Sequence, residues 1–185
     1  MQIGVLKRLF AFTALIVVLG ACAGGSPIQQ YEGTTVYTQT NLWFDSNRHM
    51  TTNYSAGYRV PINTRVEILD SNRNAIVLRV PDLDRNVRIE NAANHTQEDI
   101  AGIYDRYFGN SQVDLSRFDS DTREAIENGR VKEGMSRDAV LLARGYPPSH
   151  QTPSLDQNVW TYWRNRFVRQ TVTFSGDRAT ELVGF

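Results

Sequence analysis

The sequence predicts an α+β fold in two parts, a strand-rich N-terminal part followed by two helices packed on a three-stranded antiparallel sheet. Three observations support this prediction. Short β-branched and aromatic segments separated by polar turns run from Thr34 to Asn91, and the apolar spacing changes to a helical period after residue 96. Residues 117–185 then contain two capped helical segments followed by three strand segments. Helices segregated to one face of an antiparallel sheet are typical of the α+β class.

The first 21 residues have the organisation of a secretory signal peptide. Basic Lys7 and Arg8 precede an apolar run of about ten residues, half the length that a membrane-spanning helix needs. Residues 19–22, Leu-Gly-Ala-Cys, resemble the bacterial lipobox, in which the cysteine is linked to diacylglycerol and becomes the first mature residue. Cys22 is the only cysteine of the chain, and acylation accounts for it better than an ordinary signal peptide followed by a stray thiol.

The remaining chain, residues 22–185, carries little net charge. Residues 1–21 contain two of the 20 basic residues and none of the 20 acidic ones, so the remainder has a net charge of −2 with histidine neutral. The absence of a long basic run argues against nucleic acid as a partner. Residues 22–32 begin with glycine, serine and proline, and they are predicted to form a flexible tether.

Residues 33–95 are predicted to form a small β domain. Polar and apolar residues alternate in its strand segments, and the turns between them are short and polar. Trp43 lies in an apolar segment, where we expect it to belong to the core. Five short strands joined by tight turns predict a small SH3-like barrel. The predicted strands are Thr35–Thr38, Leu42–Phe44, Arg65–Leu69, Ala75–Val80 and Asn86–Glu90.

Residues 96–116 are predicted to form a linking helix and a loop. Thr96 to Asp99 have the spacing of a capping box, and apolar residues then recur at helical spacing from Ile100 to Phe108. Gly109 follows and is expected to end the helix. The apolar face of this helix is expected either to close the barrel or to pack between the two domains.

Residues 117–185 are predicted to form an α+β domain. One helix is expected from about Asp121 to Asn128, and a second from Arg137 to Arg144. Ser136 is placed as the N-cap of the second helix, and Gly145 as its stop. Short connections between the later segments indicate an antiparallel meander. The expected strands are Val159–Trp163, Phe167–Phe174 and Ala179–Phe185.

The motifs of this last domain resemble those of the SmpA/OmlA (BamE-like) lipoproteins. They are, in order, the Gly-Met-Ser helix start within Val131–Val140, the segment Gly145–Pro148, the Trp-x-Tyr strand at Trp160–Tyr162, and the hairpin segment Thr171–Gly176. Members of this family are outer-membrane lipoproteins, and the best-known one assists the machinery that inserts β-barrel proteins. The resemblance therefore implies an outer-membrane location and a protein partner in the envelope.

Motifs for catalysis or metal binding are absent from the sequence, so we predict a protein that is not an enzyme and uses no cofactor or metal. There is no Gly-x-Ser-x-Gly elbow, no phosphate-binding loop and no histidine pair at metal-ligand spacing. Residues 82–93 begin like a calcium loop, but Val87 replaces the required glycine and Ala93 replaces the bidentate glutamate. This segment is interpreted as a turn.

The histidines and one acidic pair give no indication of a site either. His49, His95 and His150 are isolated in polar segments, where we expect them to be solvated. Asp119 and Asp121 precede a helix and are interpreted as capping residues.

The last strands offer a candidate recognition surface. Strand alternation places Trp163 on the face opposite the expected core. There it would lie beside Arg164, Arg166 and Arg169, a combination that suits a protein hot spot or an anionic headgroup. The alternative is that Trp163 packs under the β-rich domain or under the linking helix.

These observations predict an outer-membrane lipoprotein that is anchored by lipid on Cys22, faces the periplasm and binds a protein partner in envelope assembly or maintenance. Ala23 follows the cysteine in place of the aspartate that typically retains lipoproteins in the inner membrane. Two alternatives remain open. In the first, the β-rich domain binds peptidoglycan. In the second, the chain is an accessory or inhibitory subunit of a periplasmic enzyme.

Overall fold

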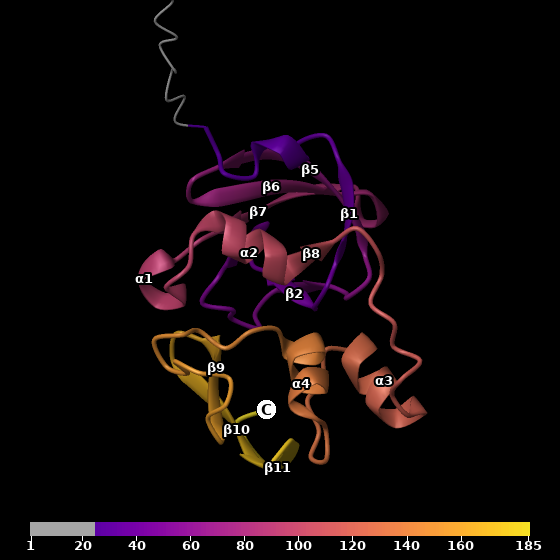
Figure 1. Cartoon of the computed structure of the whole chain (residues 1–185), viewed down its shortest axis with the longest axis vertical. Coiled ribbons are helices and arrows are strands. Elements are labelled where there is room, and N and C mark those ends of the chain that lie inside the picture. The colour runs from indigo at the N-terminus through magenta and orange to yellow at the C-terminus, as the bar shows by residue number, and fades with distance from the viewer. Residues whose placement is uncertain (1–24) are drawn as a thin grey trace, which may run out of the picture.

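A curled six-stranded sheet forms one end of the molecule and a three-stranded sheet with two helices forms the other (Figure 1). The computed structural model describes residues 25–185, and the predicted signal peptide and Cys22 lie outside these residues. We call residues 25–109 the N-terminal unit and residues 117–185 the C-terminal unit. The α+β class that the sequence predicts is confirmed.

The helices and strands have the following bounds. The helices are η1 Gln29–Tyr31, η2 Pro81–Leu83, α1 Ala93–Thr96, α2 Ile100–Tyr107, α3 Ser120–Glu127 and α4 Arg137–Arg144. The strands are β1 Thr35–Thr38, β2 Leu42–Phe44, β3 Arg48–Met50, β4 Tyr58–Val60, β5 Arg65–Asn72, β6 Ala75–Val80, β7 Arg85–Glu90, β8 Phe108–Gly109, β9 Val159–Asn165, β10 Val168–Ser175 and β11 Arg178–Val183. Within residues 25–185, no helix is long and apolar enough to cross a membrane.

The N-terminal unit is built on the sheet β3-β7-β6-β5-β1-β8, with β2 and β4 paired separately. Its neighbouring strands are antiparallel except β3 and β7, which are parallel. Alternate residues of the strands, such as Val66 and Ile68 in β5, are fully buried. They form one apolar core with the buried face of α2. The helix therefore closes this unit, which is the first of the two positions expected for it.

The start and the end of α2 differ from the prediction. Asp99 is the N-cap, and its carboxylate accepts a hydrogen bond from the Gly102 N–H at 2.9 Å. Thr96 instead ends the short helix α1, and its hydroxyl donates to Asn91 Oδ1 at 3.0 Å. Gly109 is not a helix stop, because the chain leaves α2 directly into β8, which pairs with β1.

The tether predicted for residues 22–32 is wrong from Ile28 onward. The Ile28 side chain is 1% exposed and belongs to the core of the N-terminal unit. The Tyr31 ring stacks on the Tyr104 ring of α2, with centroids 4.3 Å apart. An isoleucine and a tyrosine that bury apolar surface fix the chain here, despite the flexible composition just before them.

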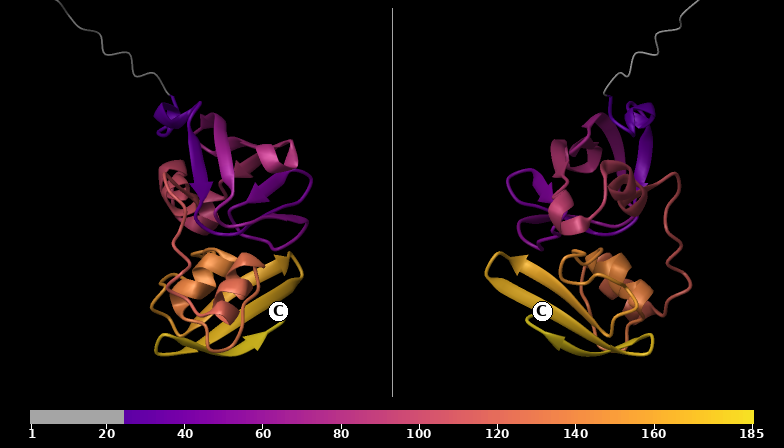
Figure 2. Two further views of the ribbon diagram at one scale, coloured as in Figure 1. Left: turned by 90° about the vertical axis from the view of Figure 1, so that its right-hand side faces the viewer. Right: turned by 60° about the vertical axis from the view of Figure 1, so that its left-hand side comes forward.

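The C-terminal unit agrees closely with the prediction. Ser136 caps α4 by accepting from the Ala139 N–H at 3.1 Å, and Gly145 ends the helix. The strands β9, β10 and β11 form the predicted antiparallel meander. Trp160 and Tyr162 are fully buried in a second apolar core beneath α3 and α4. Figure 2 shows the two helices on one face of this sheet.

Candidate functional site

The two units meet through buried polar side chains. Asn41 lies in the connection between β1 and β2 and is fully buried. Its Nδ2 donates to the carbonyls of Ile126 at 2.7 Å and of Ala143 at 3.0 Å. These carbonyls belong to the last turns of α3 and α4, where helical carbonyls have no intrahelical donor. One asparagine of the N-terminal unit therefore caps both helices of the C-terminal unit.

A second asparagine continues this junction. Asn53 Nδ2 donates to the carbonyls of Arg144 and Tyr146, both at 2.9 Å. Its Oδ1 accepts from Nη1 of Arg144 at 3.2 Å. Because Asn53 is buried, this amide is satisfied by the other unit and not by solvent. The junction fixes how the units sit together by directional bonds.

Arg144, the last residue of α4, is the unusual group of this junction. Its side chain is 2% exposed, and its guanidinium lies 4.9 Å from the Trp43 ring and 5.0 Å from the Tyr162 ring. Nη2 donates to the Trp163 carbonyl at 2.9 Å and to Gln170 Oε1 at 3.4 Å. Its Nε has no hydrogen-bond partner among the described residues.

Only neutral groups balance the charge of Arg144. In residues 25–185, no carboxylate forms an ion pair with it. Burial lowers the pKa of the guanidinium to about 10, which leaves it protonated at neutral pH. A buried cation without a counter-charge costs free energy, so its presence at this position requires an explanation.

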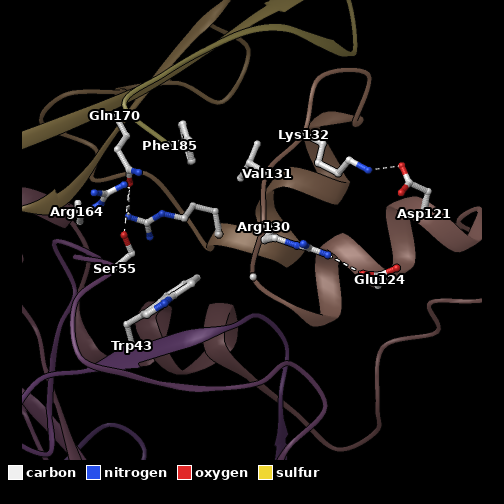
Figure 3. Close-up of a pocket in the computed structure, with 12 residues that line it drawn as sticks. Trp43, Ser55, Asp121, Glu124, Arg130, Val131, Lys132, Arg164, Gln170 and Phe185 are labelled. Atoms are coloured by element: carbon white, nitrogen blue, oxygen red, sulfur yellow. Dashed lines mark hydrogen bonds and ion pairs between the residues drawn. The ribbon is translucent and has the colours of Figure 1, made fainter.

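A cavity of about 660 Å³ opens beside this arginine at the junction (Figure 3). We call it the Trp43 cleft. One wall is formed by α3 and the segment that follows it, where Arg130 pairs with Glu124 at 2.7 Å and Lys132 pairs with Asp121. The opposite wall carries Arg164 of β9, which has no ion pair among the described residues. The lining residues are Trp43, Ser55, Asp121, Glu124, Gly129, Arg130, Val131, Lys132, Arg144, Arg164, Gln170 and Phe185.

A second hollow, of about 780 Å³, lies between the tip of the β9–β10 hairpin and the loops around β2 and β3. We call it the hairpin groove. Phe167 at the hairpin tip is 76% exposed, and the Arg166 guanidinium lies 4.5 Å from its ring centre. The lining residues are Trp43, Asp45, Ser46, Arg48, Met50, Tyr54, Ala56, Asn165, Arg166 and Phe167. Trp43 thus contributes to both hollows.

The structure divides the four residues of the predicted recognition surface between two faces. Trp163 is half-buried, and its backbone bridges to Tyr54 of the N-terminal unit. Arg169 pairs opposite Trp163 in the sheet register, so these two share a face. Arg164 lies in the Trp43 cleft on the other face, and Arg166 lies in the tight turn at the hairpin groove. All three arginines are exposed.

Sequence reasoning missed Trp43, Arg144 and Phe167 as site residues. Trp43 is 9% exposed, but it belongs to neither apolar core and lies between the units. A signal for Arg144 was present, because it follows Val140 by four residues and therefore lies on the apolar face of its helix. Phe167 had no comparable signal, since its exposure depends on the two-residue turn between β9 and β10.

The prediction that His49 is solvated is wrong. His49 lies in β3 and is buried. Its Nδ1 lies 2.9 Å from the Trp43 carbonyl, and its Nε2 lies 3.2 Å from the Tyr107 hydroxyl. A carbonyl only accepts, so Nδ1 carries the proton and Nε2 accepts from the tyrosine. Burial is the main cause that lowers the pKa of His49 to about 4.

The other predicted polar residues are placed as follows. His95 and His150 are exposed, but they are not isolated, since their rings are 4.4 Å apart across the junction. Asp119 is the N-cap of α3, and Asp121 lies in the first turn, as expected for capping residues. Within residues 25–185, no three His, Asp or Glu side chains converge as metal ligands would.

Comparison with known proteins adds no relative. No protein-family model, no curated protein and no solved structure matches this chain. The functional interpretation therefore depends on the geometry of the junction and on the motifs of the sequence.

Proposed function

We propose that this protein is a non-enzymatic lipoprotein, anchored in the outer membrane and facing the periplasm, that binds a protein partner through the hairpin groove. The observation that carries the proposal is Phe167, a large aromatic side chain that is 76% exposed at the rim of a hollow. Aromatic residues and arginine are enriched among the side chains that dominate binding energy in protein interfaces.

The groove offers the other features of such an interface. Trp43 and Tyr54 give it an aromatic lining, and Arg48 and Arg166 lie along it with one carboxylate, Asp45. Arg48 pairs with Glu90 at 3.4 Å, whereas Arg166 forms no ion pair among the described residues. The free charge of Arg166 favours a partner segment in which an apolar residue has an acidic neighbour. Aromatic side chains can stack on a partner and bury its apolar surface, and the polar side chains of the groove can hydrogen-bond to it. This lining supports a role in recognition.

The finer fold assignments are part of the same proposal. The antiparallel meander β5-β6-β7 and its pairing with β1 support an SH3-like barrel for the N-terminal unit. The cap at Ser136, the stop at Gly145 and the buried pair Trp160 and Tyr162 support a BamE-like C-terminal unit. We propose both on these features, together with the lipobox at Cys22.

The anchor is tested first, by labelling with radioactive palmitate and by membrane fractionation. The wild-type chain is expected to incorporate label and to fractionate with the outer membrane. The Cys22→Ser variant is expected to incorporate none. Label in the Cys22→Ser variant, or an inner-membrane location of the wild type, would contradict this part of the proposal.

Partner binding is tested by crosslinking and affinity purification from native membranes. Phe167→Ser is expected to lose the crosslinked partner, whereas Leu83→Ser is expected to retain it. Leu83 is the matched control, because it is 41% exposed and lies on the N-terminal unit outside the groove. Equal capture by both variants would contradict the role of the groove. Retention of the wild type on purified sacculi at high salt would favour peptidoglycan binding instead.

A further inference from the structure

The Trp43 cleft contains two arginines that form no ion pair in the described part of this chain. Arg144 is buried in its wall, and Arg164 is exposed at its surface. The remaining cations of the cleft, Arg130 and Lys132, each have a carboxylate partner on α3. The lining carries four cationic and two anionic side chains, so the side chains alone sum to a charge of +2. The uncompensated charge lies on one wall.

The guanidinium of Arg144 has N–H groups that form no hydrogen bond in the described part of the chain. Its three bonds engage at most three of the five N–H groups of a guanidinium, and all three acceptors are neutral oxygens. Nε is buried and has no acceptor among residues 25–185. The Trp43 and Tyr162 rings stabilise the cation through their faces, but they supply no counter-charge. An anion in the cleft would supply it.

We propose that the Trp43 cleft binds a carboxylate-bearing ligand. The exposed Arg164 would hydrogen-bond the carboxylate, and the buried charge of Arg144 would attract it from within the wall, where the dielectric constant is low. Trp43 and Phe185 line the same cavity and would contact the apolar part of the ligand (Figure 3). The volume of about 660 Å³ lies in the range of small-molecule and peptide-end sites.

The surroundings favour a single negative charge over a phosphate dianion. Arg144 is the last residue of α4, and Gly129 follows the C-terminal end of α3. The cleft therefore faces the carbonyl ends of two helices, where the helix dipoles are negative. Phosphate sites typically use the opposite end of a helix. A planar monoanion that matches one guanidinium fits this cleft better.

The carboxylate could belong to the free C-terminus of a peptide or to a small carboxylic acid. Both kinds of ligand are tested on the full chain in detergent, and binding is followed by two-dimensional NMR of the Trp43 indole and the Gln170 side-chain amide. The probes are N-acetyl-Ala-Ala, its C-terminal amide, benzoate and inorganic phosphate. Saturable shifts with N-acetyl-Ala-Ala or benzoate, and none with the amide, support the proposal, and the tighter of the two acids identifies the source.

Variants separate binding from the structural role of the junction. Arg164→Gln changes an exposed side chain and is expected to weaken acid binding by about tenfold, the loss of one charge-assisted hydrogen bond. Arg169→Gln, on the other face of the same hairpin, is the matched control and is expected to bind as the wild type does. The proposal is overturned if phosphate binds more tightly than both acids, if the amide binds equally, if no probe binds, or if Arg164→Gln has no effect.

Discussion

Acid should destabilise this protein through one histidine. His49 is buried with its Nδ1 donating to the Trp43 carbonyl and its Nε2 accepting from the Tyr107 hydroxyl. Protonation places a charge in the core and removes the acceptor that the hydroxyl uses. Burial is the largest cause that lowers the pKa of His49, the Trp43 carbonyl opposes it, and the charge of Arg144 lowers the pKa further.

The magnitude follows from the difference between the folded and the unfolded pKa. The pKa of His49 is about 4 in the folded chain, against 6.5 for a histidine in an unfolded chain. The unfolded state therefore binds the proton first as the pH falls. The free energy of unfolding is unaffected by this group above pH 6.5 and falls by about 1.4 kcal/mol per pH unit below it. The full loss, near pH 4, is about 3 kcal/mol, a large part of a typical stability.

The assay is urea unfolding followed by tryptophan fluorescence at pH 7.5, 6.0, 5.0 and 4.5. The variant His49→Gln is destabilised at every pH, but it should lose less stability than the wild type between pH 7.5 and 4.5. The expected difference in this loss is about 2 to 3 kcal/mol. The variant His95→Gln, at an exposed histidine, serves as control and should follow the wild type. Equal losses in the wild type and His49→Gln would refute the reasoning.

Three substitutions test other contacts by the same unfolding assay. Asn41→Ala should cost about 3 kcal/mol, because the Ala143 carbonyl at the end of α4 loses its donor and the Ile126 carbonyl at the end of α3 keeps only the Gly129 N–H; a loss below about 1 kcal/mol would show that water replaces the amide. Ser136→Ala should cost about 1 kcal/mol through the N-cap of α4, and an unchanged midpoint would contradict that role. Gly57→Ala should cost more than about 2 kcal/mol, since φ is +84° and the new Cβ would clash with the Phe44 carbonyl oxygen; wild-type stability would show that the loop relaxes.

Local chemistry made the C-terminal unit predictable. Ser136 and Gly145 bound α4 through interactions within a few residues, and the turn at Arg166 is short enough to require an antiparallel partner. The strands β3 and β4 were not predicted. Each has three residues, and each is held by its pairing with a predicted strand, β7 for β3 and β2 for β4, a pairing that the local pattern of so short a segment does not indicate.

The junction could not be predicted for a related reason. Asn41 and Asn53 look like ordinary loop residues, yet their partners lie 85 to 102 residues away along the chain. The prediction for His49 failed because its polar neighbours in sequence are not its neighbours in space. The arginines of the β9–β10 hairpin are exposed, as their positions predicted, but the two faces on which Arg164 and Arg169 lie depend on the register of the sheet.

The burial of Ile28 limits how far the folded chain can lie from the lipid that we propose on Cys22. If Cys22 carries the lipid as we propose, only five residues separate it from the first core side chain. A chain of this length reaches about 20 Å when fully extended. The described chain begins at the end of the molecule opposite the sheet β9–β11 (Figure 1). The N-terminal unit would thus pivot close to the headgroups without travelling far from them, and it would lie between the anchor and both hollows at the junction.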